Sequence, residues 1–143
     1  ATLRHAPADA LPDVIKPNAA EASALLGQPI EDRAQALQAA RDLSAWGLGA
    51  VVITLGEQGA VAVTDEGPYV ILPVPVPVVN AAGAGDGFNA GLMQARLQDK
   101  PWADALRWAA AVATAVVLTA GPGECRLEDA RALSRRVCVE RPN

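Results

Sequence analysis

The sequence predicts an α/β layered fold, because segments typical of buried strands alternate with segments typical of helices. Residues 49–55 form an apolar, β-branched run, the pattern of a strand that is buried on both faces. Residues 32–46 place alanine, leucine and tryptophan at helical spacing and are followed by a glycine. Two short apolar runs flank Asp65-Glu66-Gly67, which predicts a β-hairpin inserted into the alternation.

The remaining elements follow the same local rules. Helices are predicted where apolar periodicity lies between a capping residue and a glycine or proline, over residues 19–26, 86–97, 102–119 and 127–135. Strands are predicted over residues 13–16, 60–64, 69–72 and 137–139. Prolines 73, 75 and 77 cannot donate to a strand ladder, so residues 73–79 are predicted to be an extended edge or a connector.

Composition excludes several classes of protein. The chain has 143 residues, enough for one domain, and it is 51% hydrophobic with a net charge of −4, so it is globular and lacks the basic footprint of a nucleic-acid-binding protein. Its uncharged runs are too short or too interrupted to span a membrane. The two cysteines, without a secretory signal, are predicted to be free thiols in a reducing, cytoplasmic compartment.

The most informative stretch is the loop from Asn80 to Gly91. Gly83, Ala84 and Gly85 have little or no side chain and precede a predicted helix, so their amides and the helix dipole suit a phosphoryl group. Asp86, on the first turn, can accept a proton from an attacking hydroxyl. The alternative is a tight turn that leads into an ordinary helix N-terminus. The spacing fits neither a P-loop, which needs Gly-Lys-Ser/Thr, nor a dinucleotide fingerprint.

Two earlier motifs have both a structural and a functional interpretation. Asn18 and Glu21 have the spacing of a capping box, and Lys16 before them is either a phosphate contact or a solvated strand-end charge. Residues 54–59, Thr-Leu-Gly-Glu-Gln-Gly, begin at the end of the buried strand and continue into the turn after it. They are either an ordinary turn or part of a ligand site at the carboxyl end of a strand.

The Asn80–Gly91 loop resembles the second signature of the PfkB (ribokinase) family, D-T-x-G-A-G-D-x-F. The resemblance extends from about Ile15 almost to the C-terminus and includes the family's N-x-x-E and Thr/Ser-Leu-Gly-x-x-Gly motifs, in order. It implies a ribokinase-like layered αβα fold and an ATP-dependent kinase that uses Mg²⁺. The resemblance further implies that Asp86 is the catalytic base and that Gly83, Ala84 and Gly85 form the anion hole. It implies that the nucleotide is bound by Asn18, Thr54, Gly56, Gly59 and Gly85. Glu21 and Asn18 are implied to hold Mg²⁺ through water.

Within the family, Lys16-Pro17-Asn18 and the ending at residues 121–125 look most like the fructose-1-phosphate and tagatose-6-phosphate kinases. The implied substrate is therefore a hexose phosphate. Gly87 departs from the serine usual in that subgroup, and Phe88-Asn89 is closer to ribokinases and ketodeoxygluconate kinases, which leaves a sugar such as theirs as the alternative. Ribokinases commonly carry an aspartate at Asn80 that helps to hold a monovalent cation, so that cofactor is left open.

Family members are about twice as long as this chain, and their first half carries the sugar-contacting residues and a β-sheet lid. Residues 1–143 are therefore predicted to be one partial domain, the C-terminal catalytic half with its inserted hairpin. The expected partners are a sugar or sugar phosphate and the missing N-terminal half, and a homo-oligomer is left open. The alternative of another class is a nucleotide-binding fragment without turnover.

Overall fold

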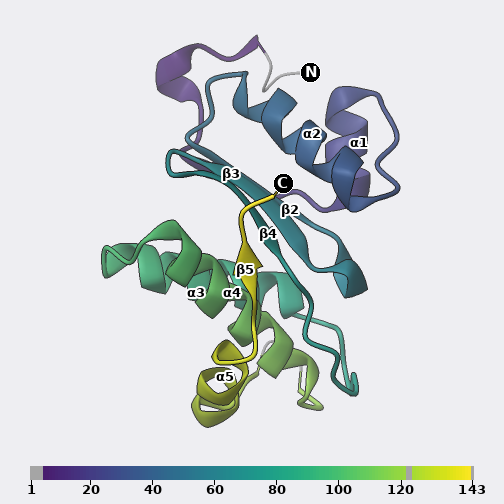
Figure 1. Cartoon of the computed structure of the whole chain (residues 1–143), viewed down its shortest axis with the longest axis vertical. Coiled ribbons are helices and arrows are strands. Elements are labelled where there is room, and N and C mark those ends of the chain that lie inside the picture. The colour runs from purple at the N-terminus through teal and green to yellow at the C-terminus, as the bar shows by residue number, and fades with distance from the viewer. Residues whose placement is uncertain (1–4, 122–123, 143) are drawn as a thin grey trace. The chain divides into compact units, whose positions relative to one another are not determined.

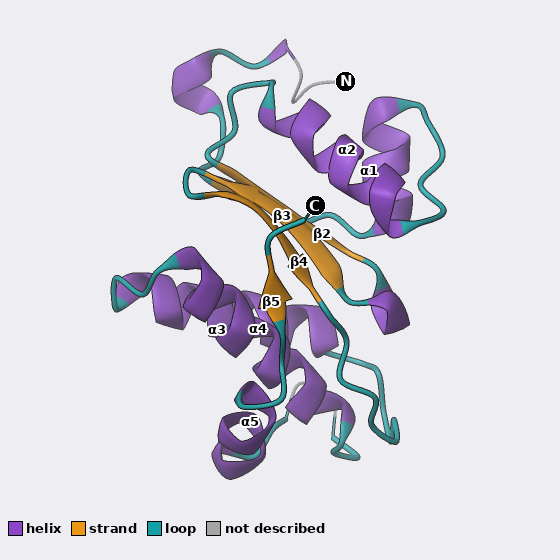
Figure 2. Ribbon diagram, in the orientation of Figure 1, coloured by secondary structure: helices purple, strands orange, loops and turns teal. Residues whose placement is uncertain are grey.

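The computed structural model describes residues 5–121 and 124–142, which divide into two compact units. The first unit comprises residues up to Val70 and the segment from Arg141, and the second comprises Ile71–Glu140. Among the described residues, a first strand is followed by two α-helices, three strands, three α-helices and a last strand (Figure 2). This mixed architecture confirms the predicted α/β class.

The first unit is a sheet with two helices on one of its faces (Figure 1). Its elements in chain order are η2 (Ala8–Ala10), β1 (Val14–Ile15), α1 (Ala19–Leu26), α2 (Arg33–Ser44), β2 (Ala50–Thr54), η3 (Gly56–Gln58), β3 (Ala60–Thr64) and β4 (Gly67–Ile71). β1 and β2 pair in parallel, with Val14 opposite Ala50, and β2 and β3 pair antiparallel. Four consecutive residues of β2 are buried, as predicted for a strand covered on both faces.

Helix and strand ends in this unit follow the predicted capping residues closely. α1 ends at Gly27, which has the predicted left-handed conformation with φ of 67°. α2 ends two residues before the predicted position, because Trp46 and Gly47 donate to carbonyls three residues back and tighten the last turn. β4 begins two residues early, because Gly67 adopts a φ of 104° and the chain reverses over Asp65 and Glu66 alone.

The second unit is built on a helical hairpin. α3 (Ala84–Leu97) and α4 (Trp102–Val117) pack side by side, and α5 (Leu127–Ser134) packs on α4 (Figure 1). Asp99, with a φ of 56°, lies between α3 and α4 at the predicted break. Residues 73–79 form a connector without strand pairing in the described structure, as expected. Pro122 and Gly123, part of the predicted stop after α4, lie outside the described residues.

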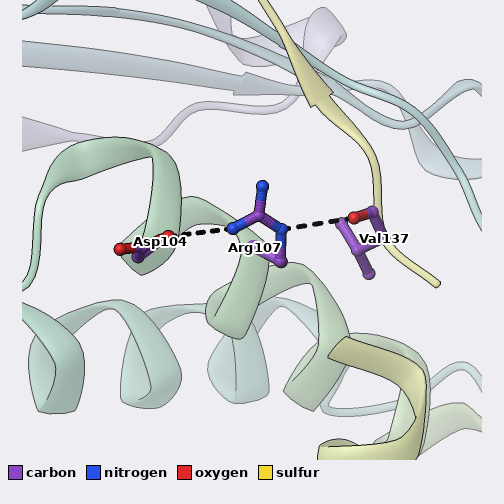
Figure 3. A network of polar contacts seen from close by, with 3 residues as sticks. All are labelled: Asp104, Arg107 and Val137. Atoms are coloured by element: carbon purple, nitrogen blue, oxygen red, sulfur yellow. Dashed lines mark hydrogen bonds and ion pairs between the residues drawn. The ribbon is translucent and has the colours of Figure 1, made fainter. Parts of the chain in front are cut away.

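Arg107 of α4 ties the chain before the last strand to this hairpin (Figure 3). It donates to Asp104 Oδ1 at 2.9 Å and to the Val137 carbonyl at 3.4 Å. Val137 lies after the end of α5, and its amide donates back to the Leu133 carbonyl instead of pairing in a strand. The last strand, β5 (Val139–Glu140), therefore begins later than predicted.

Both cysteines are free, as predicted, and both are exposed. The Cys138 thiol donates to Glu140 Oε1 at 3.5 Å, and this hydrogen bond, together with the charge of the carboxylate, raises the pKa of the thiol. The thiolate, which is the nucleophilic form, is therefore less populated than in an unperturbed cysteine. Among the described residues, no helix has both the length and the apolar composition needed to cross a membrane.

Candidate functional site

The first two motifs meet at the carboxyl ends of adjacent parallel strands. Thr54, the last residue of β2, donates its amide to the Pro17 carbonyl at 3.1 Å, and Asn18 forms a parallel bridge with Thr54. The sequence places these motifs 36 positions apart, and the β1–β2 pairing brings them together. This edge of a sheet is where open α/β proteins bind ligands.

Asn18 and Glu21 form the predicted capping box at the start of α1. Glu21 N donates to Asn18 Oδ1 at 2.8 Å, and Asn18 N donates to Glu21 Oε2 at 2.9 Å. Both residues are exposed, and the capping box uses only one carboxylate oxygen of Glu21. The structural interpretation of this motif is therefore confirmed, and the second oxygen remains outside the capping box.

These residues suit a hydrated Mg²⁺ better than a metal caged by protein. The described residues contain no cluster of three His, Cys, Asp or Glu side chains that could enclose an ion. Mg²⁺ commonly keeps several waters and binds through one or two carboxylates together with substrate phosphates. A single exposed carboxylate with a fixed orientation fits that mode.

The turn that follows β2 keeps its backbone open. Gly56 has a φ of 58° and Gly59 a φ of 88°, and a Cβ built on Gly56 would meet no atom within 4 Å. The turn closes on itself, since the Leu55 amide donates to the Gly59 carbonyl at 2.8 Å. A ligand can therefore approach the backbone at Gly56 without displacing a side chain.

An open hollow of about 350 Å³ lies between these motifs in the first unit. Its lining residues come from the start of α1, the α1–α2 loop and the turn after β2: Asn18, Ala19, Ala20, Ile30, Glu31, Thr54, Leu55, Gly56 and Gln58. The amides of Ala19 and Ala20 are among the first of a helix and have no carbonyl one turn back, so they favour an anion.

The hollow contains three of the predicted site residues, Asn18, Thr54 and Gly56, whereas Gly59 and Glu21 are absent from its lining. Gln58 lies inside the predicted 54–59 motif but was given no role of its own, and Ile30 and Glu31 were not predicted. Nothing in the sequence marks Ile30 and Glu31, because a loop residue enters a site only through the path of the backbone, which the helix packing determines.

Asp86 and the glycine loop belong to the second unit. Gly83, with a φ of 86°, is the N-cap of α3, so the helix begins at Ala84, two residues before the predicted start. Asp86 is exposed at the third helical position, on the predicted first turn. The amides of Gly83, Gly85 and Asp86 belong to the orphan set of a helix N-terminus, whereas Ala84 N donates to the Ala81 carbonyl at 3.4 Å.

Asn80 anchors the loop that leads to Gly83. Its Oδ1 accepts from Ala82 N at 2.9 Å, and its Nδ2 donates to the Ala120 carbonyl at 3.1 Å. If the side-chain amide were turned over, its NH₂ group would face the N–H of Ala82 and its oxygen would face the Ala120 carbonyl. The hydrogen bonds therefore determine the orientation of the Asn80 amide.

Close packing with α4 fixes the helix that carries Asp86. A Cβ on Gly87 would lie 2.9 Å from Val116 Cγ2, and one on Gly91 would lie 3.0 Å from Ala109 Cα. A serine at position 87 would place its Cβ against the same Val116 methyl group. The two glycines thus let α3 approach the backbone of α4.

Replacing Gly91 by Val is expected to destabilise the protein by about 1–3 kcal/mol, because the added methyl groups must displace the backbone of α4. The free energy of unfolding in urea measures this effect. Ala90→Val is the matched control, since Ala90 is exposed on the same helix and valine there costs only about 0.6 kcal/mol of helix propensity. Equal losses for the two variants would contradict the packing argument.

Comparison with known proteins assigns the family. The model of the family described as "pfkB family carbohydrate kinase" matches residues 3–130. The chain belongs to the pfkB family of carbohydrate kinases. A 1-phosphofructokinase of Rhodobacter capsulatus is 36% identical over 131 residues, which are 92% of this chain and 42% of that protein.

Solved structures of pfkB kinases share the fold. Phosphofructokinase-2 from Escherichia coli in complex with potassium has a TM-score of 0.80 at 26% identity, over 87% of this chain and 40% of that one. Arabidopsis thaliana ribokinase complexed with ribose and ATP has a TM-score of 0.79 at 30% identity, over 90% and 42%. The predicted ribokinase-like fold is confirmed, and the chain spans about two fifths of the length of these relatives.

Proposed function

We propose that this chain supplies the ATP site, the anion hole and the catalytic base of a kinase that phosphorylates a hydroxyl of a sugar phosphate. The observation that carries the proposal is the meeting of Asn18 and Thr54 at the carboxyl ends of β1 and β2. There a helix N-terminus and an open glycine turn border one hollow. Neither motif alone distinguishes a ligand site from a cap or a turn.

The residues of the first unit are proposed to bind the nucleotide. The first amides of α1, the Thr54 hydroxyl and the backbone of Gly56 are assigned to the phosphates, and Gly59 keeps the turn in its conformation. Mg²⁺ would be held through water by Glu21 and Asn18, and when bound it neutralises charge on the phosphate oxygens. The ATP in the ribokinase complex is consistent with this assignment.

The residues of the second unit are proposed to perform the transfer. The Asp86 carboxylate takes the proton of the substrate hydroxyl, whose oxygen forms a bond to the γ-phosphorus while the bond to the β,γ-bridging oxygen breaks and ADP leaves. The amides of Gly83 and Gly85 stabilise charge on the transferred group. Ala84 is assigned a smaller part in the anion hole, because its amide already donates to the Ala81 carbonyl.

The proposed acceptor is a hexose phosphate such as fructose 1-phosphate or tagatose 6-phosphate, supported by the similarity to 1-phosphofructokinases. A sugar of the ribokinase or ketodeoxygluconate kinase type is the second candidate, favoured by the similarity to Arabidopsis ribokinase and by Phe88-Asn89. We further propose that the protein acts in the cytoplasm, and that an N-terminal half completes the kinase.

Replacing Glu21 by Gln tests the nucleotide site. Glutamine also serves in a capping box, so the change should cost at most about 1 kcal/mol of stability. If Glu21 orders Mg²⁺, Glu21→Gln should raise the Mg²⁺ concentration needed for ATP binding, measured by calorimetry over a Mg²⁺ series. Glu31→Gln removes another carboxylate of the hollow and is the control. An unchanged Mg²⁺ requirement, or the same change in both variants, would argue against the proposal.

A further inference from the structure

Arg33 connects two walls of the hollow without lining it. Its Nη2 donates to the Gln58 carbonyl at 3.2 Å, a contact between the start of α2 and the turn after β2. Ile30 and Glu31, just before Arg33, line one side of the hollow, and Gln58 lines another. The guanidinium group therefore couples the position of the α1–α2 loop to that of the glycine turn.

The position of Arg33 argues against a role in stabilising its own helix. It is the first residue of α2, and a positive charge at a helix N-terminus opposes the helix dipole. Its Nε is buried and has no hydrogen-bond partner among the described residues, which is a further cost. Asp32 already caps the helix by accepting from Gln35 N at 2.7 Å. The contact with Gln58 is thus the favourable interaction that the structure gives this side chain.

The turn that Arg33 contacts is closed at its base by the pairing of β2 with β3, with Thr54 opposite Ala60. Within the turn, backbone hydrogen bonds of 2.8–3.2 Å join residues 55–59, and Arg33 adds a side-chain contact from another element. Both of its glycines have positive φ, a conformation that glycine enters easily and also leaves easily. A contact from α2 at the Gln58 carbonyl therefore adds a restraint to a turn whose glycines can change conformation.

We propose that Arg33 is a positioning residue that holds the Gly56–Gln58 turn in the conformation facing the hollow and so sets the affinity for the phosphates of a nucleotide. The identity of the ligand, a nucleotide, rests on the proposed function. The contact between Arg33 and Gln58 does not depend on it. Arg33 touches neither the nucleotide nor the metal in this role. It acts through the backbone of Gln58.

Three variants of the chain test the inference. Arg33→Met keeps most of the aliphatic stem and removes the donor, Arg33→Lys keeps a donor and the charge, and Arg41→Met removes a charge from the same helix away from the turn. Hydrogen exchange of the Leu55, Gln58 and Gly59 amides reports on the turn. ATP–Mg²⁺ titration reports on the site, and thermal unfolding reports on the whole chain.

We expect Arg33→Met to accelerate exchange of these three amides by about tenfold and to weaken ATP binding by a similar factor. The melting temperature should not fall, because a charge unfavourable to the helix dipole is removed. Arg33→Lys should restore part of both effects, and Arg41→Met should show neither. Unchanged exchange at the turn, or faster exchange throughout with a lower melting temperature, would overturn the inference.

Hydrogen exchange at the turn and ATP–Mg²⁺ titration together separate this inference from the proposed function. If the wild-type chain binds no ATP, the proposed function fails for this chain, and faster exchange in Arg33→Met still supports the role of Arg33 in the turn. If the turn loosens while ATP affinity stays the same, the role of Arg33 toward the nucleotide is refuted.

Discussion

Replacing Asp86 by Asn is expected to lower the rate of phosphoryl transfer by about 10²–10⁴-fold, the usual contribution of a general base. Asparagine preserves the shape of the side chain but cannot accept the proton of the attacking hydroxyl. ATP affinity should be largely unchanged, because the nucleotide-binding residues that we assign to the first unit are intact. The measurement is kcat with ADP release as the readout, on the complete kinase that includes the proposed N-terminal half.

The control for this variant removes the same charge from the same kind of position. Asp129 is the third residue of α5, as Asp86 is of α3, so Asp129→Asn costs a similar interaction with the helix dipole, about 0.3–1 kcal/mol. It should leave kcat unchanged. Activity of Asp86→Asn within a few fold of the wild type would refute the assignment of the base.

The chain alone is expected not to phosphorylate any sugar or sugar phosphate at an enzyme-like rate. Holding both reactants in attacking geometry contributes about 7–11 kcal/mol to catalysis, and we propose that the sugar platform lies in the missing half. The chain spans 42% of its Rhodobacter relative, which leaves room for that half. Weak binding of ATP–Mg²⁺ is expected to survive in the isolated chain.

Exposed apolar side chains of the second unit support the expectation that the isolated chain lacks a partner segment. Met93 and Leu97, one helical turn apart on α3, are 64% and 81% exposed, and Val78 and Val79 are also exposed. Exposed apolar surface of this kind favours association with another chain. The isolated chain should therefore self-associate in size-exclusion chromatography, or pair with a separately expressed N-terminal half.

Mixing the two halves provides the decisive measurement. ADP release should become measurable on mixing, and comparison of fructose 1-phosphate, tagatose 6-phosphate, ribose and ketodeoxygluconate identifies the acceptor. A mixture of the N-terminal half with the Asp86→Asn chain is the control and should remain inactive. Robust turnover by the isolated chain would mean that its sugar site lies within these residues, and the interpretation as a half-enzyme would be wrong.

Interactions between residues close in the sequence were sufficient to predict the helices and strands and to recognise each motif separately. α1 has the predicted bounds because Asn18 and Gly27 terminate it through contacts within a few residues. The burial of β2 followed from its apolar composition. The errors were confined to element ends, as at Trp46 and Gly67, where hydrogen bonds over three residues or a positive φ determined the boundary.

The sequence by itself thus determined the α/β class, the family motifs and the chemistry available at Asp86, since each depends on neighbouring residues. Only the tertiary structure decided which segments share a surface. The pairing of β1 with β2 placed Asn18 beside Thr54, and the path of the α1–α2 loop brought Ile30 and Glu31 to the hollow. The contact of Arg33 with Gln58 likewise joins residues 25 positions apart. Such contacts depend on how helices pack on the sheet, which no local pattern specifies.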